Sequence, residues 1–564
     1  MKRAVVLLVF LFAACFAYSQ DIAGDWQGTL NTGMGELRLV LHITKAADGA
    51  LKATLDSIDQ PGANGIPVQS ITLKDSRLTL DVAAVRGTYD GKVSSDAKTI
   101  SGTWTQGQAL PLEFKRAAAP VKTDHKQAKP SDIDGTWLGT VDMGVAKLRV
   151  VFHITNTEDG LVATMDSPDQ NLRDIPMTSC TRDGANLKIE ARNLNGVFEG
   201  KIAADLQSID GTFTQMGAAH PLPLKRVKDQ AELEVRRPQT PNKPYPYREE
   251  EVSYDNKVQN VRLAATFTIP PGTGTFPAVL LITGSGPQDR DESLMGHKPF
   301  LILSDYLTRH GIAVLRADDR GTGKSTGAFA GATTSDFATD AEAGVAYLKT
   351  RSEVNPHKIG LIGHSEGGLI APMIAARNRD VAFIVMMAGT GVPGDQVLVA
   401  QGEAIELAMG KSPTDAATDA AHEKETIKLV ETEKDERALE KELKQTMAGR
   451  VPEALMGAQI KEITSPWFRY FLTYDPATAL RKVTCPVLAI NGSLDKQVLP
   501  DQNLPAIRKA LEQAGNKHFE IDELPGLNHL FQTAKTGAPA EYAEIEETMS
   551  PVALGKISTW ILQR

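Results

Sequence analysis

Two patterns of hydrophobic and polar positions divide the chain near residue 249. Before that point, apolar and polar residues alternate in short runs such as 37–43 and 100–104, and turn-forming Asp-Gly and Asn-Gly pairs separate the runs. Alternation with a period of two puts every second side chain on the same face of a strand. Short strands at this spacing are typical of small antiparallel barrels or sandwiches, so the first part of the chain is predicted to be all-β.

From residue 249 the apolar runs become continuous and alternate with helical segments. The continuous runs lie at residues 278–283, 312–316, 359–363, 382–387 and 487–491. Helical segments lie between them, for example at 299–309 and 335–349. A strand that is apolar throughout is buried on both faces. We therefore predict an α/β domain at 249–564, with a mostly parallel sheet covered by helices.

The all-β part carries the same sequence pattern twice. IAGDWQGT at 22–29 recurs as IDGTWLGT at 133–140, and LRLVLHIT at 37–44 recurs as LRVVFHIT at 148–155. Further segments recur in the same order, which indicates a duplication. The predicted layout is a first repeat at 21–116, a linker at 117–132, a second repeat at 133–228 and a Pro-rich linker at 229–248.

The first twenty residues are typical of a signal peptide. Lys2 and Arg3 precede an apolar run, and small residues at the end of that run offer a cleavage site. The run is shorter than the roughly 20 residues of a membrane span, so no transmembrane anchor is expected after cleavage. We expect an exported protein, periplasmic or extracellular. Residues 12–15 also resemble a lipoprotein box, which leaves lipidation of Cys15 as an alternative.

Composition excludes some classes of function. The formal net charge of −9 argues against a nucleic-acid binder, which normally carries a basic patch. Cys180 and Cys485 fall in different predicted domains, so no disulfide framework is expected. The sequence has no CxxC or HExxH pattern, and neither a metal nor a cofactor is implied. His42 and His153 lie among apolar residues of predicted strands and are interpreted as structural.

One motif carries a nucleophile. The sequence GHSEGG at 363–368 follows a continuous apolar run and opens a helical segment. A GxSxG motif between a strand and a helix is a nucleophile elbow, in which a sharp turn exposes the serine hydroxyl. The flanking positions must lack bulk because the strand and helix backbones crowd together there. Ser365 is therefore the predicted nucleophile.

A serine nucleophile needs a general base, and the base needs an acid that orients it. Asp495 ends the turn after the apolar run at 487–491, and His529 ends the loop after the next predicted strand. This chain order of serine, acid and histidine fits the elbow motif. Three other acids compete for the orienting role, namely Asp475, Asp501 and Asp522. His518 is interpreted as a surface residue, and His364 as a residue that packs or caps.

The loop at 284–288 follows a central strand, where a second oxyanion donor is expected. Backbone N–H groups of Ser285 or Gly286, together with that of Glu366, are the predicted oxyanion hole. The acids at 289–292 are interpreted as a loop salt-bridge network, with substrate binding as the alternative. The segment at 318–325 lacks the first glycine of a phosphate-binding loop, because Asp318 occupies that place.

An insertion at about 391–476 interrupts the alternation of strands and helices. It includes a charged helical run at 422–444, with Glu and Lys at spacings of three and four. A helical insertion between two sheet strands is where a lid would close over a pocket. We therefore predict a helical lid.

These motifs together resemble a known family. They are GSGPQDRD at 284–291, DRGxGxS at 319–325, GHSEGG at 363–368, SPWF at 465–468 and the Asp495/His529 pair. The set is similar to bacterial exported carboxylesterases of the α/β-hydrolase superfamily, and to their serine aminopeptidase and dipeptidyl-peptidase-like branches. The resemblance covers about residues 245–564. It implies ester hydrolysis by Ser365, Asp495 and His529, although Thr283 stands where many relatives have histidine.

Three functions remain open at this point. The first is a secreted carboxylesterase acting on small-molecule esters. The second is a serine peptidase acting on short peptides, because the same triad serves both and the acidic cluster at 289–292 could hold a substrate amine. The third, of another class, is a catalytically inert binding protein of the cell envelope whose repeats carry the function.

Overall fold

The computed structural model describes the greater part of the chain. The described residues are 22–31, 36–45, 51–57, 66–74, 76–82, 85, 87–94, 96–106, 108–116, 128–143, 147–170, 172–191, 195–215, 217–229, 233, 236–451 and 453–564. The predicted signal peptide, Cys15 and most of the first linker lie outside them. None of the described helices combines the length and apolarity that a membrane span requires.

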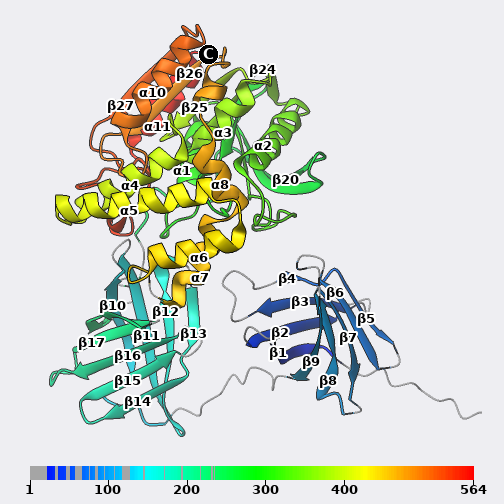
Figure 1. The fold of residues 1–564 in the computed structure, drawn as a ribbon, viewed down its shortest axis with the longest axis vertical. Helices are drawn as coiled ribbons and strands as arrows, with labels where there is room; N and C mark the ends of the chain where they lie inside the picture. The colour runs from blue at the N-terminus through cyan, green and yellow to red at the C-terminus, as the bar shows by residue number, and fades with distance from the viewer. Residues whose placement is uncertain are drawn as a thin grey trace, which may run out of the picture. The chain divides into compact units, whose positions relative to one another are not determined.

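The first all-β region is one curled antiparallel sheet (Figure 1). Its strands are β1 (Gly24–Asn31), β2 (Glu36–Lys45), β3 (Leu51–Ser57), β4 (Ile66–Pro67), β5 (Ser70–Lys74), β6 (Arg77–Val82), β7 (Gly87–Val93), β8 (Thr99–Gln106) and β9 (Gln108–Arg116), in the order β4-β3-β2-β1-β9-β8-β7-β6-β5. Trp26 is fully buried in its core, donates its indole N–H to the Ile22 carbonyl at 2.9 Å, and lies under the Arg116 guanidinium.

The second all-β region has the same plan. Its strands are β10 (Gly135–Asp142), β11 (Lys147–Thr157), β12 (Gly160–Ser167), β13 (Leu172–Pro176), β14 (Ser179–Asp183), β15 (Asn186–Ala191), β16 (Gly196–Ile202), β17 (Ser208–Gln215), β18 (Ala218–Pro221) and β19 (Leu224–Arg226), in the order β13-β12-β11-β10-β19-β17-β16-β15-β14, with β18 paired to β17. Trp137 takes the place of Trp26: it donates to the Ile133 carbonyl at 3.0 Å and lies under Arg226. Both regions are open, curled sheets in the manner of half-barrels, as the barrel-or-sandwich prediction anticipated.

The histidines of these sheets are hydrogen-bonded to neighbouring strands. His42 lies between Asp25 and Asp56, at 2.7 and 3.0 Å. His153 contacts Thr136 and Asp166, at 3.2 and 3.1 Å. Across the described residues, no group of three or more His, Cys, Asp or Glu side chains is arranged to hold a metal ion.

The third region is built on an eight-stranded sheet (Figure 1). Its strands are β20 (Arg248–Asn256), β21 (Val261–Ile269), β22 (Phe276–Ile282), β23 (Ala313–Ala317), β24 (Val354–His364), β25 (Phe383–Met387), β26 (Val487–Gly492) and β27 (Phe519–Leu524), in the order β20-β21-β23-β22-β24-β25-β26-β27. The first three are joined antiparallel, and all later pairings are parallel. The predicted α/β domain and its strands are thereby confirmed.

Helices cover both faces of this sheet. They are α1 (Pro299–Arg309), α2 (Thr334–Lys349), α3 (Glu366–Ala375), α9 (Ala477–Leu480), α10 (Pro500–Gln513) and α11 (Pro551–Leu562). Helices α2, α3 and α10 share a buried apolar cluster with one face, whereas α1 and α11 pack on the other. Alternate residues of β22 enter the two clusters, with Leu280 in the first and Val279 and Leu281 in the second. This two-sided burial explains why the strand is apolar throughout.

The predicted lid is a bundle of helices between β25 and β26 (Figure 1). The helices are α4 (Gly394–Ala408), α5 (Pro413–Thr432), α6 (Glu436–Met447), α7 (Glu453–Ile463) and α8 (Pro466–Thr473). They have an apolar cluster of their own, which includes Val430, Leu443 and Leu472. The charged run predicted at 422–444 is divided between α5 and α6, because Asp435 caps the start of α6 by accepting from the Ala438 N–H at 2.8 Å.

The last part of the Pro-rich linker lies against the α/β domain. Arg237 donates to the carbonyls of Met295 and Ala543, at 2.8 and 3.0 Å. The Gln239 side chain donates to the Met549 carbonyl at 2.7 Å and accepts from the N–H groups of Thr548 and Met549. The end of the segment that the sequence predicts as a Pro-rich linker is therefore hydrogen-bonded to the domain that follows it.

Candidate active site

Ser365 occupies the turn between β24 and α3 with a strained backbone. Its φ is +53°, in the region that residues with a side chain rarely adopt. The neighbouring glycines are required by packing. A Cβ on Gly363 would overlap the carbonyl of Gly367, and one on Gly367 would overlap the carbonyl of Ile282. The crowding expected at a nucleophile elbow is therefore present, and it presents Ser365 at the carboxyl end of the sheet.

Asp495 and His529 meet at the ends of β26 and β27. Nδ1 of His529 lies 2.9 Å from Oδ2 of Asp495, and both side chains are buried. The other carboxylate oxygen of Asp495 accepts from the N–H groups of Gln497 and Val498, each at 2.8 Å. These bonds fix the carboxylate, which in turn orients the imidazole.

The competing acids and histidine lie elsewhere. Asp475 accepts from the Ala477 N–H at the start of α9, Asp501 is exposed in the first turn of α10, and Asp522 pairs with Lys556. His518 is exposed, as predicted.

The predicted oxyanion donors lie beside Ser365. A Cβ on Gly284 would come within 3.3 Å of the Ser365 Cβ, so the loop after β22 passes directly over the serine. Ser285, Gly286, Glu366, Ser365 and His529 all line one cavity of about 840 Å³. The N–H of Gly284 itself is engaged by the Glu292 carboxylate at 2.9 Å.

A buried Glu292–His364 pair supports both loops of the site. Nδ1 of His364 lies 2.9 Å from Oε1 of Glu292, and its Nε2 lies 3.0 Å from the His529 carbonyl oxygen. Burial opposes a charge on His364, but the Glu292 carboxylate and these hydrogen bonds outweigh it and raise the pKa of His364. A protonated ring donates at both nitrogens. The pair therefore links the loop of His529 to the Gly284 loop, which the assignment of His364 as a packing or capping residue did not foresee.

The Glu366 side chain turns away from solvent and towards the lid. Its Oε1 accepts from the Thr334 hydroxyl at 2.7 Å and from the Trp467 indole N–H at 2.8 Å. Burial raises the pKa of Glu366, and hydrogen bonds from Thr334, Trp467 and the Ser285 hydroxyl offset only part of that effect. Trp467 belongs to a motif that the sequence singled out, but its contact with residue 366 has no local signature.

The charged loop at the mouth is largely a structural network. Asp291 pairs with Arg316 at 2.9 Å, and Asp289 accepts from the N–H groups of Asp291 and Ser293. Next to this loop, Asp319 accepts from the Thr283 hydroxyl at 2.8 Å and from the Gln288 N–H at 2.9 Å. Burial, with smaller effects from neighbouring carboxylates, raises the pKa of Asp319 to about 7. The acids thus serve mainly to hold the loop in place.

The lid supplies an apolar wall to the cavity. Val397 and Leu398 of α4 and the three aromatic residues of α8 contribute to it, namely Trp467, Phe468 and Phe471. The rings of Trp467 and Phe471 are stacked, with centroids 5.6 Å apart. None of the described residues that line this cavity is Lys or Arg, whereas Asp289, Glu292, Glu366 and Glu462 are acidic.

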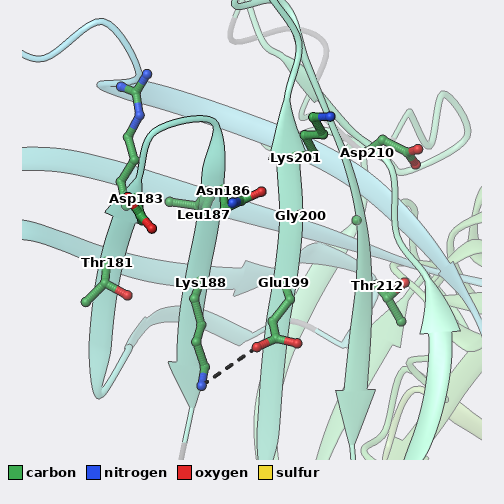
Figure 2. A pocket seen from close by; sticks show the side chains of 12 residues that line it. Thr181, Asp183, Asn186, Leu187, Lys188, Glu199, Gly200, Lys201, Asp210 and Thr212 are labelled. Atoms are coloured by element: carbon green, nitrogen blue, oxygen red, sulfur yellow. Dashed lines mark ion pairs between the residues drawn. The ribbon is translucent and has the colours of Figure 1, made fainter.

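A second large cavity, of about 670 Å³, lies on the strands β14–β17 (Figure 2). Its wall is polar, and Lys188 and Glu199 form an ion pair across neighbouring strands (Figure 2). Its described lining contains neither serine nor histidine. Ser365 and His529, in contrast, both line the cavity of about 840 Å³.

Comparison with known proteins supports a hydrolase. Residues 259–523 match the X-Pro dipeptidyl-peptidase family, S15. Esterase EstD of Thermotoga maritima is 28% identical over 302 residues, which are 53% of this chain and 66% of that protein, slightly less than two thirds. One match is to a peptidase family and the other to an esterase, so the two agree on a serine hydrolase and differ in the bond that is cleaved.

Two solved esterases are similar to part of the chain. The Pyrococcus furiosus esterase Pf2001 is 17% identical and covers 58% of this chain and 96% of its own, with a TM-score of 0.37. Est1E of Butyrivibrio proteoclasticus, solved with ferulic acid, is 19% identical and covers 55% of this chain and 98% of its own, with a TM-score of 0.33.

Proposed function

We propose that this chain, whose carboxyl-terminal region is a serine hydrolase domain of the α/β-hydrolase superfamily, cleaves carboxylic esters through an acyl-enzyme on Ser365. The observation that carries the proposal is the cavity in which the strained Ser365 and the Asp495-bound His529 lie together. The likeness to an esterase adds support for an ester substrate.

The proposed mechanism uses His529 as base and then as acid. Its Nε2 takes the Ser365 hydroxyl proton as the oxygen attacks the ester carbonyl, and the oxyanion accepts from the N–H groups of Glu366 and of Ser285 or Gly286. Asp495 holds the proton on Nδ1 of His529 and stabilises the imidazolium. The imidazolium then protonates the leaving alcohol, and a water molecule activated by His529 releases the acid.

The lining of the cavity suggests the substrate. The aromatic wall of α8 suits an apolar or aromatic acyl group, because such groups gain most by leaving water. The acidic residues and the lack of Lys and Arg among the described lining residues disfavour an anionic acyl group. The preferred substrate is therefore an uncharged ester.

A peptidase is the second candidate, supported by the match to the X-Pro dipeptidyl-peptidase family. The acidic lining, with Glu462 and Asp289, would attract the free amine of a short peptide. The triad would act in the same way on an amide.

Substrate panels separate the two candidates. Purified protein would be assayed on p-nitrophenyl esters of acetate, butyrate and octanoate, on a p-nitrophenyl hemiester of a dicarboxylic acid, and on aminoacyl and dipeptidyl anilides. We expect turnover of neutral esters above that of the hemiester and the anilides. Anilide turnover exceeding ester turnover would replace our first choice with the peptidase.

Labelling tests the nucleophile and the inert alternative together. A fluorophosphonate probe should label the wild type, and Ser365→Ala should abolish the label while leaving the melting temperature unchanged within a few degrees. A wild type that takes no label would instead support an inert binding protein. We also propose export to the periplasm or the medium, which fractionation of cells producing the full chain would test.

A further inference from the structure

The residue after the nucleophile joins three separate parts of the domain. The Glu366 side chain is 2% exposed, and its Oε1 accepts from Thr334 at the start of α2 and from Trp467 of the lid helix α8. Ser285, on the loop after β22, lines the same cavity, and hydrogen bonding from its side chain lowers the pKa of this carboxyl group. One buried side chain thus contacts the lid, a helix and the proposed oxyanion loop.

The same residue also contributes its backbone. Its N–H is a proposed oxyanion donor, so a shift of the side chain shifts a group that contacts the reacting atoms. Oxyanion stabilisation depends on preorganised donors, so the N–H of residue 366 and the loop of Ser285 must be held close to their best positions, within roughly a few tenths of an ångström. The carboxyl group belongs to residue 366 and interacts with Ser285, so it acts on both donor positions.

The lid side of the contact is also well defined. Helix α8 begins at Pro466, with the Ser465 hydroxyl accepting from the Phe468 N–H at 3.2 Å. The Trp467 ring stacks on Phe471 with an interplanar angle of 9°, which orients the indole N–H. In this position of α8, the Trp467 indole N–H reaches the Glu366 carboxyl group at 2.8 Å.

We propose that Glu366 and Trp467 are positioning residues that couple the lid to the oxyanion hole, so that the hole is correctly formed only when α8 is seated. The inference rests on the proposed esterase function. It assigns the lid a part in the chemical step in addition to shaping the pocket.

Burial raises the pKa of Glu366, which lessens the negative charge on this carboxyl group, and its Oε1 accepts from both Thr334 and Trp467. Asp319 and Glu292 are the other acids near this loop, and Asp319 is also shifted towards its neutral form. A negative charge here would oppose the developing oxyanion.

The test compares three substitutions in the full chain. Trp467→Phe removes the indole N–H and keeps an aromatic ring. Glu366→Gln keeps an acceptor and a donor, whereas Glu366→Leu removes both. Trp560→Phe is the matched control, because the Trp560 indole N–H is buried in α11 without a hydrogen-bond partner among the described residues.

The readouts are kcat and KM for p-nitrophenyl acetate, whose small acyl group has little contact with the lid, and the affinity for an alkyl boronic acid that forms a tetrahedral adduct. We expect Trp467→Phe to lower kcat about tenfold, the effect of one lost hydrogen bond to a buried group, with KM changed less than about twofold. Boronate affinity should fall by about the same factor. Glu366→Leu should lose far more than Glu366→Gln, and the Trp560→Phe control should match the wild type.

Two results would overturn the coupling while leaving the esterase proposal intact. One is a Trp467→Phe protein whose KM rises at unchanged kcat, which would make Trp467 a pocket residue alone. The other is an equal loss in the Gln and Leu variants of Glu366. If Trp467→Phe melts early, its kcat is measured well below its melting temperature, where the same fall must appear. A wild type that cleaves none of the esters would instead refute the proposed function itself.

Discussion

Replacing Asp495 with Asn should reverse the tautomer of His529. One carboxylate oxygen of Asp495 accepts two backbone N–H groups, from Gln497 and Val498, each at 2.8 Å. In the amide, this position must be taken by the oxygen, because an NH₂ group there would face two donors. The NH₂ then lies opposite Nδ1 of His529, now 2.9 Å from a donor. Nδ1 must accept, the ring proton moves to Nε2, and the base for Ser365 is lost.

The expected loss is large in rate and small in stability. Tautomer reversal in a serine triad lowers kcat about 10⁴-fold, or about 5.5 kcal/mol at 1.36 kcal/mol per factor of ten. The side-chain volume is unchanged, so the free energy of unfolding should fall by no more than about 2 kcal/mol. The assay is kcat on p-nitrophenyl butyrate at pH 7, beside Asp501→Asn, which alters an exposed acid of α10. If the Asp495 variant kept more than about one hundredth of the wild-type kcat, the orienting role would be refuted.

Two further predictions concern the supports of the site. Glu292→Gln breaks a buried ion pair and should lower the free energy of unfolding by about 3 kcal/mol at pH 6, measured by urea denaturation. Because the pair raises the pKa of His364, its contribution to the free energy of unfolding is complete below the ordinary pKa of about 6.5 and declines as pH rises through the raised pKa. The loss of stability in Glu292→Gln should therefore shrink at alkaline pH. A loss of stability that is independent of pH would contradict a charged pair. Gly363→Ala should cut fluorophosphonate labelling of Ser365 at least tenfold and lower the melting temperature, since its Cβ overlaps the Gly367 carbonyl; normal labelling and melting would show that the elbow can relax.

The sheet and the elbow were predictable because their signals are local. The apolar run at 359–363 lies within β24, and that at 312–316 matches β23 within one residue. Both patterns follow from burial on two faces, which acts on consecutive residues. The strand before Ser365 and the helix after it can both be predicted from residues 358–369, which contain the GHSEGG motif.

The supports of the site were not predictable, because their partners are distant in the chain. His364 contacts Glu292, 72 positions away, and Trp467 contacts Glu366, 101 positions away. No periodicity links such residues, and only the assembled sheet and lid bring them together. The division of the charged run into α5 and α6 was missed for another reason: a single capping residue, Asp435, outweighed a helical pattern that continues on both sides.

The contacts of the Pro-rich segment with the α/β domain affect where a truncated form of the protein should begin. A fragment that begins at residue 245 would match the sequence resemblance but would lack Gln239, and the N–H groups of Thr548 and Met549 would lose their acceptor. It would also lack Arg237, which holds the Met295 carbonyl in the turn next to Leu294 of the active-site cavity. A fragment that keeps these hydrogen bonds must therefore begin at or before residue 236, ahead of the first residue of the sequence resemblance.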